Sequence, residues 1–531
     1  MIKIRNAVCA VIGVVLLFAV LPPVSTHAAG NISKEQADVL YNRVKDALLA
    51  GENYIDVHDM QLTVDMYADR FSPEYQRALD AVEKARSDYG TFVFGENKED
   101  FCLVSIDTEP TENADEFGVG ENNLIAVEVF YNPTYQNPDG TCDVTHLNHD
   151  RAIIEREYQA ALSVVEESMC DAEKALVLYD YLIALLNYPD HKGFDEKGFM
   201  TYESKYHDVA NVFCEKMAVC DAYALAYVYL LNDCGIDAVT VSCEDIQHEW
   251  AMVKIDGTWY HADLTWDDSR YPDGWTECEE HNADPWDIGA VNHKYFLKSD
   301  QEIMALEHPN WRLLKKGTSQ VSHTPKADRS NAFQQEFFFS GNDWSNTRFN
   351  YIGGRWYFLN RAENCVMETT YGTSDAPIKK IDRFDEQIYY VHGDGTYLYL
   401  CTCDNIYRFN PATDELQPVM QASSLSDGAQ FSEMSVASNL LTVVAISPSE
   451  STKNDFDSRI IETNLENLQP LQDVTEFSQS TETPPQLERT LTTKQTTSNF
   501  VFGNGLWILI AVAVLICAAT AVFLFRKRKN N

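Results

Sequence analysis

Hydrophobic positions in the first part of the chain repeat at two different spacings. A stripe that returns every three to four residues indicates an amphipathic helix, whereas strict alternation indicates a half-buried strand. Helical spacing occurs over 33–49 and 73–87, and strand-like runs occur over 91–94, 101–106 and 124–131. We therefore predict a small α+β module over residues 30–148.

The next segment, 149–316, combines apolar helices with a hairpin. Helices are predicted at 151–169 and 172–186, and a third begins at Cys220 and stops near Gly235. Glycine is favoured just beyond the end of a helix, which supports that boundary. The following stretch, HEWAMVKIDGTWYHADLTWDD, is predicted to be a β-hairpin, because Asp-Gly is a pair that two-residue hairpin loops favour.

The loop of this hairpin decides which of its polar side chains share a face. If Asp256-Gly257 is the loop, counting back along both arms places His248 and Asp263 on one face, at diagonal positions. A slip of one residue would put them on opposite faces. His261 falls on the same face, so it competes with His248 for any role there. We prefer His248, because it enters from the strand end and has Asp263 as its diagonal partner.

Cys220, His248 and Asp263 together suit acyl transfer through a thiol. A thiol needs a lowered pKa to be a good nucleophile at neutral pH, and a helix N-terminus with a nearby imidazolium supplies that. The imidazole needs a third group that fixes its orientation and tautomer. We expect the backbone N–H of Cys220 to donate to the oxyanion, and a second donor is not assigned. An isolated cysteine is more often a small buried residue, so the prediction depends on the set.

The residues around the triad also resemble a known family. The matching pieces are Val219-Cys220, Tyr223-Ala224, Gly235-Ile236, His248-Glu249-Trp250, residues 253–261 and 263–268, the upstream helix 172–182, and His293 to Leu297. Over roughly residues 150–305 this pattern resembles the transglutaminase-like superfamily. The resemblance implies an α+β, papain-like catalytic core, with Cys220, His248 and Asp263 as the triad and a thioester intermediate.

Two positions depart from the family pattern. The family often has glycine after the nucleophile, where this chain has Asp221, and often has alanine after the histidine, where this chain has Glu249. The three triad positions are intact. These departures therefore concern turnover more than the fold.

Residues 333–475 differ in kind from the segment before them. A polar stretch, 318–331, is predicted to be a linker, and short aromatic strands with Gly/Asn/Asp turns follow it. We predict a β-rich meander or sandwich domain, because the repeat is degenerate and too short for a complete propeller. Its aromatics are expected to be mainly core, with glycan or protein binding as the alternative.

The two ends of the chain predict a membrane-anchored ectodomain. Residues 1–29 have the basic start, apolar run and small-residue cleavage site of a signal peptide, with an uncleaved anchor as the alternative. Residues 506–525 carry no charge and are followed by four consecutive cations, which predicts a transmembrane helix and a cytoplasmic tail, 526–531. Residues 476–503, rich in Thr and Ser, are predicted to be a flexible stalk. We expect the N-terminal ectodomain to lie outside the cell.

The charge of the chain limits its partners. The net charge is −40 at pH 7, and the ectodomain is more acidic still, because six basic residues lie in the signal and the tail. Such a surface argues against nucleic acid and anionic headgroups. The acidic runs 112–116 and 277–280 lack the spaced loop of a calcium site, and Cys401-x-Cys403 has no second pair at zinc spacing. No metal or cofactor is expected.

Cysteine usage suggests an oxidising location. The sequence has 13 cysteines, of which Cys9 lies in the signal and Cys517 in the predicted membrane span. The other eleven cysteines are an odd number, which predicts one free thiol, assigned here to Cys220, and up to five disulfides. Cys102 with Cys142 is a reasonable local pair.

The sequence therefore predicts a membrane-anchored extracellular cysteine enzyme that acts on peptide or carboxamide bonds. Its acceptor would be an amine or water, and its substrate a protein, a peptide or cell-wall material. The alternative is an inactive transglutaminase-fold surface protein that binds peptide or cell-wall material. Fast alkylation of Cys220 near neutral pH would separate the two.

Overall fold

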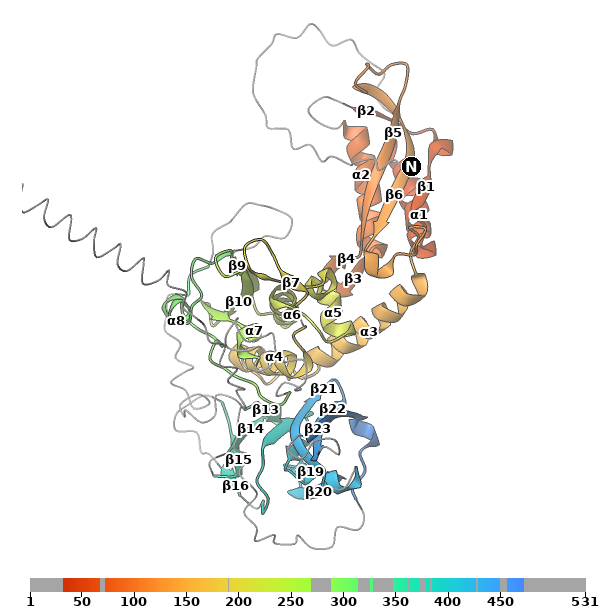
Figure 1. Ribbon diagram of the computed structural model, residues 1–531. Helices are drawn as coiled ribbons and strands as arrows, with labels where there is room; N and C mark the ends of the chain where they lie inside the picture. Colours follow the sequence, from red (N-terminus) through yellow and green to blue (C-terminus); the bar gives the residue numbers. More distant parts are fainter. Residues whose placement is uncertain are drawn as a thin grey trace, which may run out of the picture. The chain divides into compact units, whose positions relative to one another are not determined.

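The computed structural model (Figure 1) describes residues 32–66, 72–189, 191–268, 288–313, 325–327, 347–361, 363–371, 379–382, 384–425, 428–448 and 456–471. These residues belong to one compact unit, which ends at Val474. The predicted signal peptide, stalk, transmembrane helix and tail lie outside the described residues. Within the described ranges, no helix is both long enough and apolar enough to cross a membrane.

The N-terminal part is a helix pair with an antiparallel sheet, drawn in red to orange in Figure 1. Strand β6 pairs with β5 and also with β1 and β2. A capping box between Ser33 and Gln36 begins the first helix, and Ser72 with Pro73 begins the second. The elements are α1 (Lys34–Ala50), α2 (Pro73–Tyr89), β1 (Tyr54–Asp56), η1 (His58–Met60), β2 (Thr63–Met66), β3 (Thr91–Phe94), β4 (Asn97–Asp100), β5 (Cys102–Pro110), β6 (Gly120–Tyr131) and η2 (Pro133–Tyr135).

The core that follows is built around two buried helices, α4 and α6. Nearly every residue of α4 and most residues of α6 are buried, which explains why their sequences are largely apolar. The first core helix begins earlier than 151, because the Asp143 side chain accepts the N–H of His146 and caps it there. The elements are α3 (Val144–Leu162), α4 (Asp171–Leu185), β7 (Gly193–Phe194), β8 (Met200–Thr201), η3 (Ser204–His207), α5 (Val209–Cys214), α6 (Cys220–Asp233), α7 (Leu264–Asp267) and α8 (Asp300–Ala305).

One four-stranded antiparallel sheet positions the candidate site. Its order is β11–β10–β9–β12, with β9 (Ala238–Cys243), β10 (His248–Ile255), β11 (Thr258–Ala262) and β12 (Arg312–Leu313). The predicted hairpin register is confirmed, since Ile255 pairs with Thr258 and Ala251 with Ala262. Pairing ends there, because Asp263 leaves the strand to cap α7. Helix α6 contacts both β9 and β10.

The β-rich part consists of three successive antiparallel meanders. The strands are β13 (Asn350–Ile352), β14 (Arg355–Asn360), β15 (Cys365–Thr369) and β16 (Lys379–Ile381), then β17 (Tyr390–Gly393), β18 (Leu398–Cys401), β19 (Asn405–Asn410) and β20 (Glu415–Gln421), then β21 (Gln430–Ala437), β22 (Leu440–Pro448) and β23 (Phe456–Asn464). Two short 3-10 turns, η5 (Ala422–Ser424) and η6 (Leu465–Asn467), follow β20 and β23. Trp356, Phe358 and Tyr399 are buried, as expected for core aromatics.

Buried polar contacts tie the first and third meanders to the helical core. The carboxylate of Asp180 on α4 accepts the Phe349 N–H at 2.7 Å. The Trp356 Nε1–H donates to Glu173 at 2.8 Å, and the Ser435 hydroxyl donates to the Ala184 carbonyl at 2.9 Å. Phe349 and Trp356 also belong to the same hydrophobic cluster as α4. The β-rich part therefore shares core with the helices rather than packing only on itself.

The predicted disulfides are wrong for the described cysteines. All ten of these cysteines are free thiols, and Cys278 lies outside the described residues. Cys102 and Cys142 are buried as small apolar residues, and burial raises their thiol pKa values to about 12 and about 11. An odd cysteine count therefore no longer singles out Cys220, and its assignment depends on its surroundings.

Candidate active site

Cys220 is the first residue of α6. Val219, in extended conformation, is the N-cap, and its N–H donates to the Tyr206 carbonyl at 3.0 Å. The first N–H groups of a helix have no partner within the helix, so the N-terminus of α6 presents donors beside the sulfur, apart from the Ala222 N–H, which the Asp221 side chain accepts at 2.9 Å. The thiol is half-buried. The backbone N–H of Glu249 lies near enough to the sulfur to lower the pKa of Cys220, so the thiol lies beside the start of β10.

His248 begins β10 directly after a tight turn. Gln247 adopts a left-handed conformation with φ 48°, which turns the chain into the strand. The ring of His248 is buried, 5.7 Å from the Trp250 ring and 5.3 Å from the Trp266 ring between centroids. Its Nε2 lies 2.7 Å from the Asp263 carboxylate. The predicted neighbours His248 and Asp263 are thus brought together through Nε2 of the imidazole.

Asp263 is completely buried and accepts four hydrogen bonds. Its Oδ1 accepts the backbone N–H groups of Thr265 at 3.0 Å and Trp266 at 3.3 Å, as the N-cap of α7. Its Oδ2 accepts from His248 at 2.7 Å and from His308 at 2.8 Å. Burial alone would raise the pKa of Asp263, but the two histidines hold that pKa well below its usual range. The group is therefore a fixed anion.

His261, the competing base, has both ring nitrogens occupied. The Trp250 Nε1–H donates to its Nδ1 at 3.0 Å, so the ring proton lies on Nε2, which is 3.0 Å from Asp300. Burial lowers the pKa of His261. This geometry makes His261 a structural link between β10, β11 and α8 rather than the partner of Cys220.

Carboxylates surround Cys220 and oppose the low thiol pKa expected from the sequence. Burial raises the pKa of Cys220 above its ordinary value, and the charges of Asp221, Glu249 and Asp263 raise it further, whereas the Glu249 N–H lowers it. The expectation of a lowered pKa is therefore wrong for this resting arrangement. The site holds a thiol, whose proton must leave as the new bond forms.

Glu249 and Asp221 are the two departures from the family pattern, and they lie together. Burial and the charge of Asp221 raise the pKa of Glu249 to about 8. His207 Nδ1 lies 2.8 Å from Asp221, and this contact raises the pKa of His207. Both acids lie close enough to the sulfur to affect its ionisation.

Glu249→Gln is expected to accelerate alkylation of Cys220 by iodoacetamide at about pH 9, by roughly three- to tenfold, because it removes a negative charge beside the thiol. Near neutral pH the gain should shrink, since a carboxyl with a pKa of about 8 is mostly uncharged there. Peptide mass spectrometry measures the rate at this one cysteine. Glu244→Gln, at an exposed position before β10, is the matched control. Unchanged rates in Glu249→Gln at about pH 9 would contradict this role.

Sequence reasoning missed His308, which lies 45 residues after Asp263 in the chain. No periodicity or turn signal points to it, because its contact with Asp263 is set by tertiary packing. His248, Asp263 and His308 place three potential metal-ligand atoms within 4.8 Å of one another. Ligands held at about 2.0 Å around tetrahedral zinc lie roughly 3.3 Å apart. The observed separations of 2.7 and 2.8 Å suit shared protons better than an ion.

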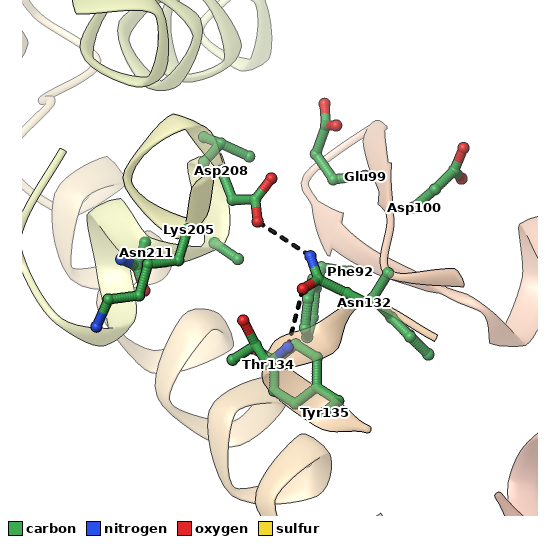
Figure 2. Close-up of a pocket in the computed structure, with 12 residues that line it drawn as sticks. Phe92, Glu99, Asp100, Asn132, Thr134, Tyr135, Lys205, Asp208 and Asn211 are labelled. Atoms are coloured by element: carbon green, nitrogen blue, oxygen red, sulfur yellow. Dashed lines mark hydrogen bonds between the residues drawn. The ribbon is translucent and has the colours of Figure 1, made fainter. Parts of the chain in front are cut away.

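A shallow pocket lies away from this cluster (Figure 2). Residues of β3, β4, η2, η3 and α5 line it, and none of the predicted triad does. The Asn132 side chain donates to Asp208 at 3.1 Å and accepts the Thr134 N–H at 3.1 Å. Lys205 and the acids Glu99 and Asp208 give its lining both signs of charge.

Residues 158–264 match the sequence model of the transglutaminase-like superfamily. This confirms the resemblance inferred from the sequence, and the matched stretch contains Cys220, His248 and Asp263. The chain therefore carries a transglutaminase-like domain. His308 lies beyond the matched stretch. No curated protein sequence matches the chain.

Three solved structures are similar to part of this chain. One is a TGase, with 14% identity over 31% of this chain and 45% of that chain, and a TM-score of 0.18. Another is a candidate protease from Parabacteroides distasonis ATCC 8503, with 13% identity over 32% of this chain and 39% of that chain, and a TM-score of 0.16. The third is a candidate cysteine protease from Cytophaga hutchinsonii, with 13% identity over 31% of this chain and 64% of that chain, and a TM-score of 0.16. The chain spans less than two thirds of each.

Proposed function

We propose that this protein is a cysteine acyltransferase or protease that uses Cys220, His248 and Asp263. The observation that supports this most strongly is the buried hydrogen bond of 2.7 Å between His248 and Asp263, whose charge acts on the thiol of the helix-opening Cys220. An anion that fixes the imidazole, and an imidazole beside a thiol, are the parts that thiol acyl transfer requires. The transglutaminase-like domain provides the fold in which they meet.

In the proposed reaction, Cys220 sulfur attacks the carbonyl carbon of a carboxamide or peptide while His248 Nδ1 takes the thiol proton. Asp263 keeps Nε2 of the same ring protonated and oriented. The backbone N–H of Cys220 donates to the oxyanion. His248 then gives its proton to the departing amine or ammonia, which leaves a thioester on Cys220. Water or an amine attacks that thioester, His248 takes the proton of the attacking group, and the thiol is restored.

The setting of this reaction is part of the proposal. The predicted signal peptide, 1–29, and the predicted transmembrane helix, 506–525, support a single-pass protein with its ectodomain outside the cell. Substrates would then be extracellular proteins or peptides, or cell-wall material. The acidic ectodomain fits basic partners rather than nucleic acid.

A second candidate function is binding without turnover. The observation that favours it is the pair Asp221 and Glu249, which stand where the family often has small residues and which raise the pKa of the Cys220 thiol. A protein with an inert thiol would retain the fold and bind a peptide at this site. The two candidates differ in whether product formation depends on Cys220.

The test uses the full chain in detergent with dimethylcasein and a biotinylated primary amine, and with labelled casein for hydrolysis. We expect amine incorporation or peptide release that falls by roughly a hundredfold or more in Cys220→Ala, because the covalent route is removed. Thermal unfolding confirms that the variant is folded. Equal rates for Cys220→Ala and the wild type, or no turnover of either acceptor, would contradict the enzyme and favour the binding function.

A further inference from the structure

His308 lies where the chain turns out of α8 and back toward β12. Its N–H donates to the Ile303 carbonyl at 3.2 Å, and Glu307 before it has a left-handed φ of 67°. The ring is completely buried. The rings of Trp250, Trp266 and Tyr295 pack around it, with centroids 4.8, 4.3 and 5.2 Å away. This packing fixes the orientation of the imidazole.

The hydrogen-bond partners of His308 are both acceptors. Nδ1 lies 2.9 Å from the Leu306 carbonyl, which can only accept, so Nδ1 carries a hydrogen. Nε2 lies 2.8 Å from Asp263 Oδ2, and an ionised carboxylate also only accepts. Both ring nitrogens therefore face acceptors, an arrangement that a doubly protonated ring satisfies.

We propose that His308 is a positioning residue of the site, which binds Asp263 as a cation and shares its Oδ2 with His248. This inference rests on the proposed function, because it concerns how the triad ionises. If the Cys220 proton moved to His248 at rest, two imidazolium rings would share one carboxylate oxygen. Their centroids are 5.5 Å apart, and like charges at that distance repel in a buried site. His308 thus opposes transfer of the Cys220 proton to His248 before substrate is attacked.

Other charged groups face this arrangement from each packed element. His248 lies on β10, and His261 lies on β11. The charge of His308 adds to burial in lowering the pKa of His261. Asp263 and Asp267 belong to α7, and Asp300 belongs to α8 with His261 as its partner. Only Asp263 is within hydrogen-bond distance of both His308 and His248 among the described residues. The effect of His308 on the thiol should therefore pass through Asp263.

The test compares His308→Gln, which can keep a neutral N–H donor near Asp263, with the wild type. We expect Cys220 alkylation by iodoacetamide at about pH 7 to rise roughly tenfold, because the thiolate–imidazolium pair no longer faces a second cation. The acid limb of the acyl-transfer rate against pH should move to higher pH. His293→Gln, in another buried His–Asp pair at 2.7 Å, is the matched control and should change neither.

A double-mutant cycle separates this role from loss of packing. In an Asp263→Asn background the effect of His308→Gln should vanish, because the shared carboxylate is gone. The alkylation readout needs no substrate, so it remains informative if acyl transfer itself is absent. An alkylation rate that stays the same or falls in His308→Gln would overturn the proposal, as would an equal effect in both backgrounds.

If His308→Gln does not fold, the wild-type chain labelled with ¹⁵N-histidine gives the answer. One ring should show both nitrogens protonated under the conditions of the alkylation assay, because both face acceptors. The same signal should become neutral in Asp263→Asn. If no ring shows both protons, or if the signal persists in Asp263→Asn, the proposal is wrong.

Discussion

His248→Ala is expected to lower the Cys220-dependent rate of acyl transfer by roughly 10³- to 10⁴-fold, because the thiol loses the base that takes its proton. The buried hydrogen bond between His248 and Asp263 leaves Nδ1 for that task. His261→Ala should leave the rate within about threefold of wild type, since its two nitrogens are bound to Trp250 and Asp300 instead. It should destabilise the fold by about 2 kcal/mol, because a buried Trp250 N–H loses its acceptor.

Asp263→Asn belongs to the same series and should reduce the rate by roughly a hundredfold, less than His248→Ala, since the imidazole remains but is poorly oriented. Initial rates of amine incorporation or hydrolysis, with thermal unfolding of each variant, give all three values. If His261→Ala silenced the reaction while His248→Ala did not, the assignment of the base from the hairpin register would be wrong.

The hairpin shows what local sequence can predict. An Asp-Gly loop fixes the register, and the alternation of the strands then places His248 and His261 on one face. Asp263 meets His248 from just beyond the end of β11, where it caps α7. Helix α6 was predicted at its observed start, because Cys220 opens a long apolar run that ends before Gly235. These features depend on neighbours within a few residues of each other, so a single sequence suffices.

The sequence alone does not predict contacts between segments that are distant along the chain. His308 and Asp263 meet only because α8 packs beside the sheet, and no pattern in the chain records it. The thiol pKa of Cys220 was predicted to be low from its helix position alone, whereas burial and three carboxylates decide it. The disulfide prediction is wrong for the same reason, because a disulfide depends on the distance between two cysteines in space, which their spacing along the chain does not supply.

The central claim is that Cys220 carries the acyl group of the substrate. The most direct measurement incubates the full chain with an acyl donor, quenches it in acid and locates the thioester by peptide mass spectrometry. We expect a hydroxylamine-sensitive adduct on the peptide that contains Cys220, and none on Cys214 or Cys234, which are also half-buried. Cys220→Ala should form no adduct. Product formed by the wild type while Cys220 stays unmodified throughout, or an adduct on another cysteine, would contradict the account.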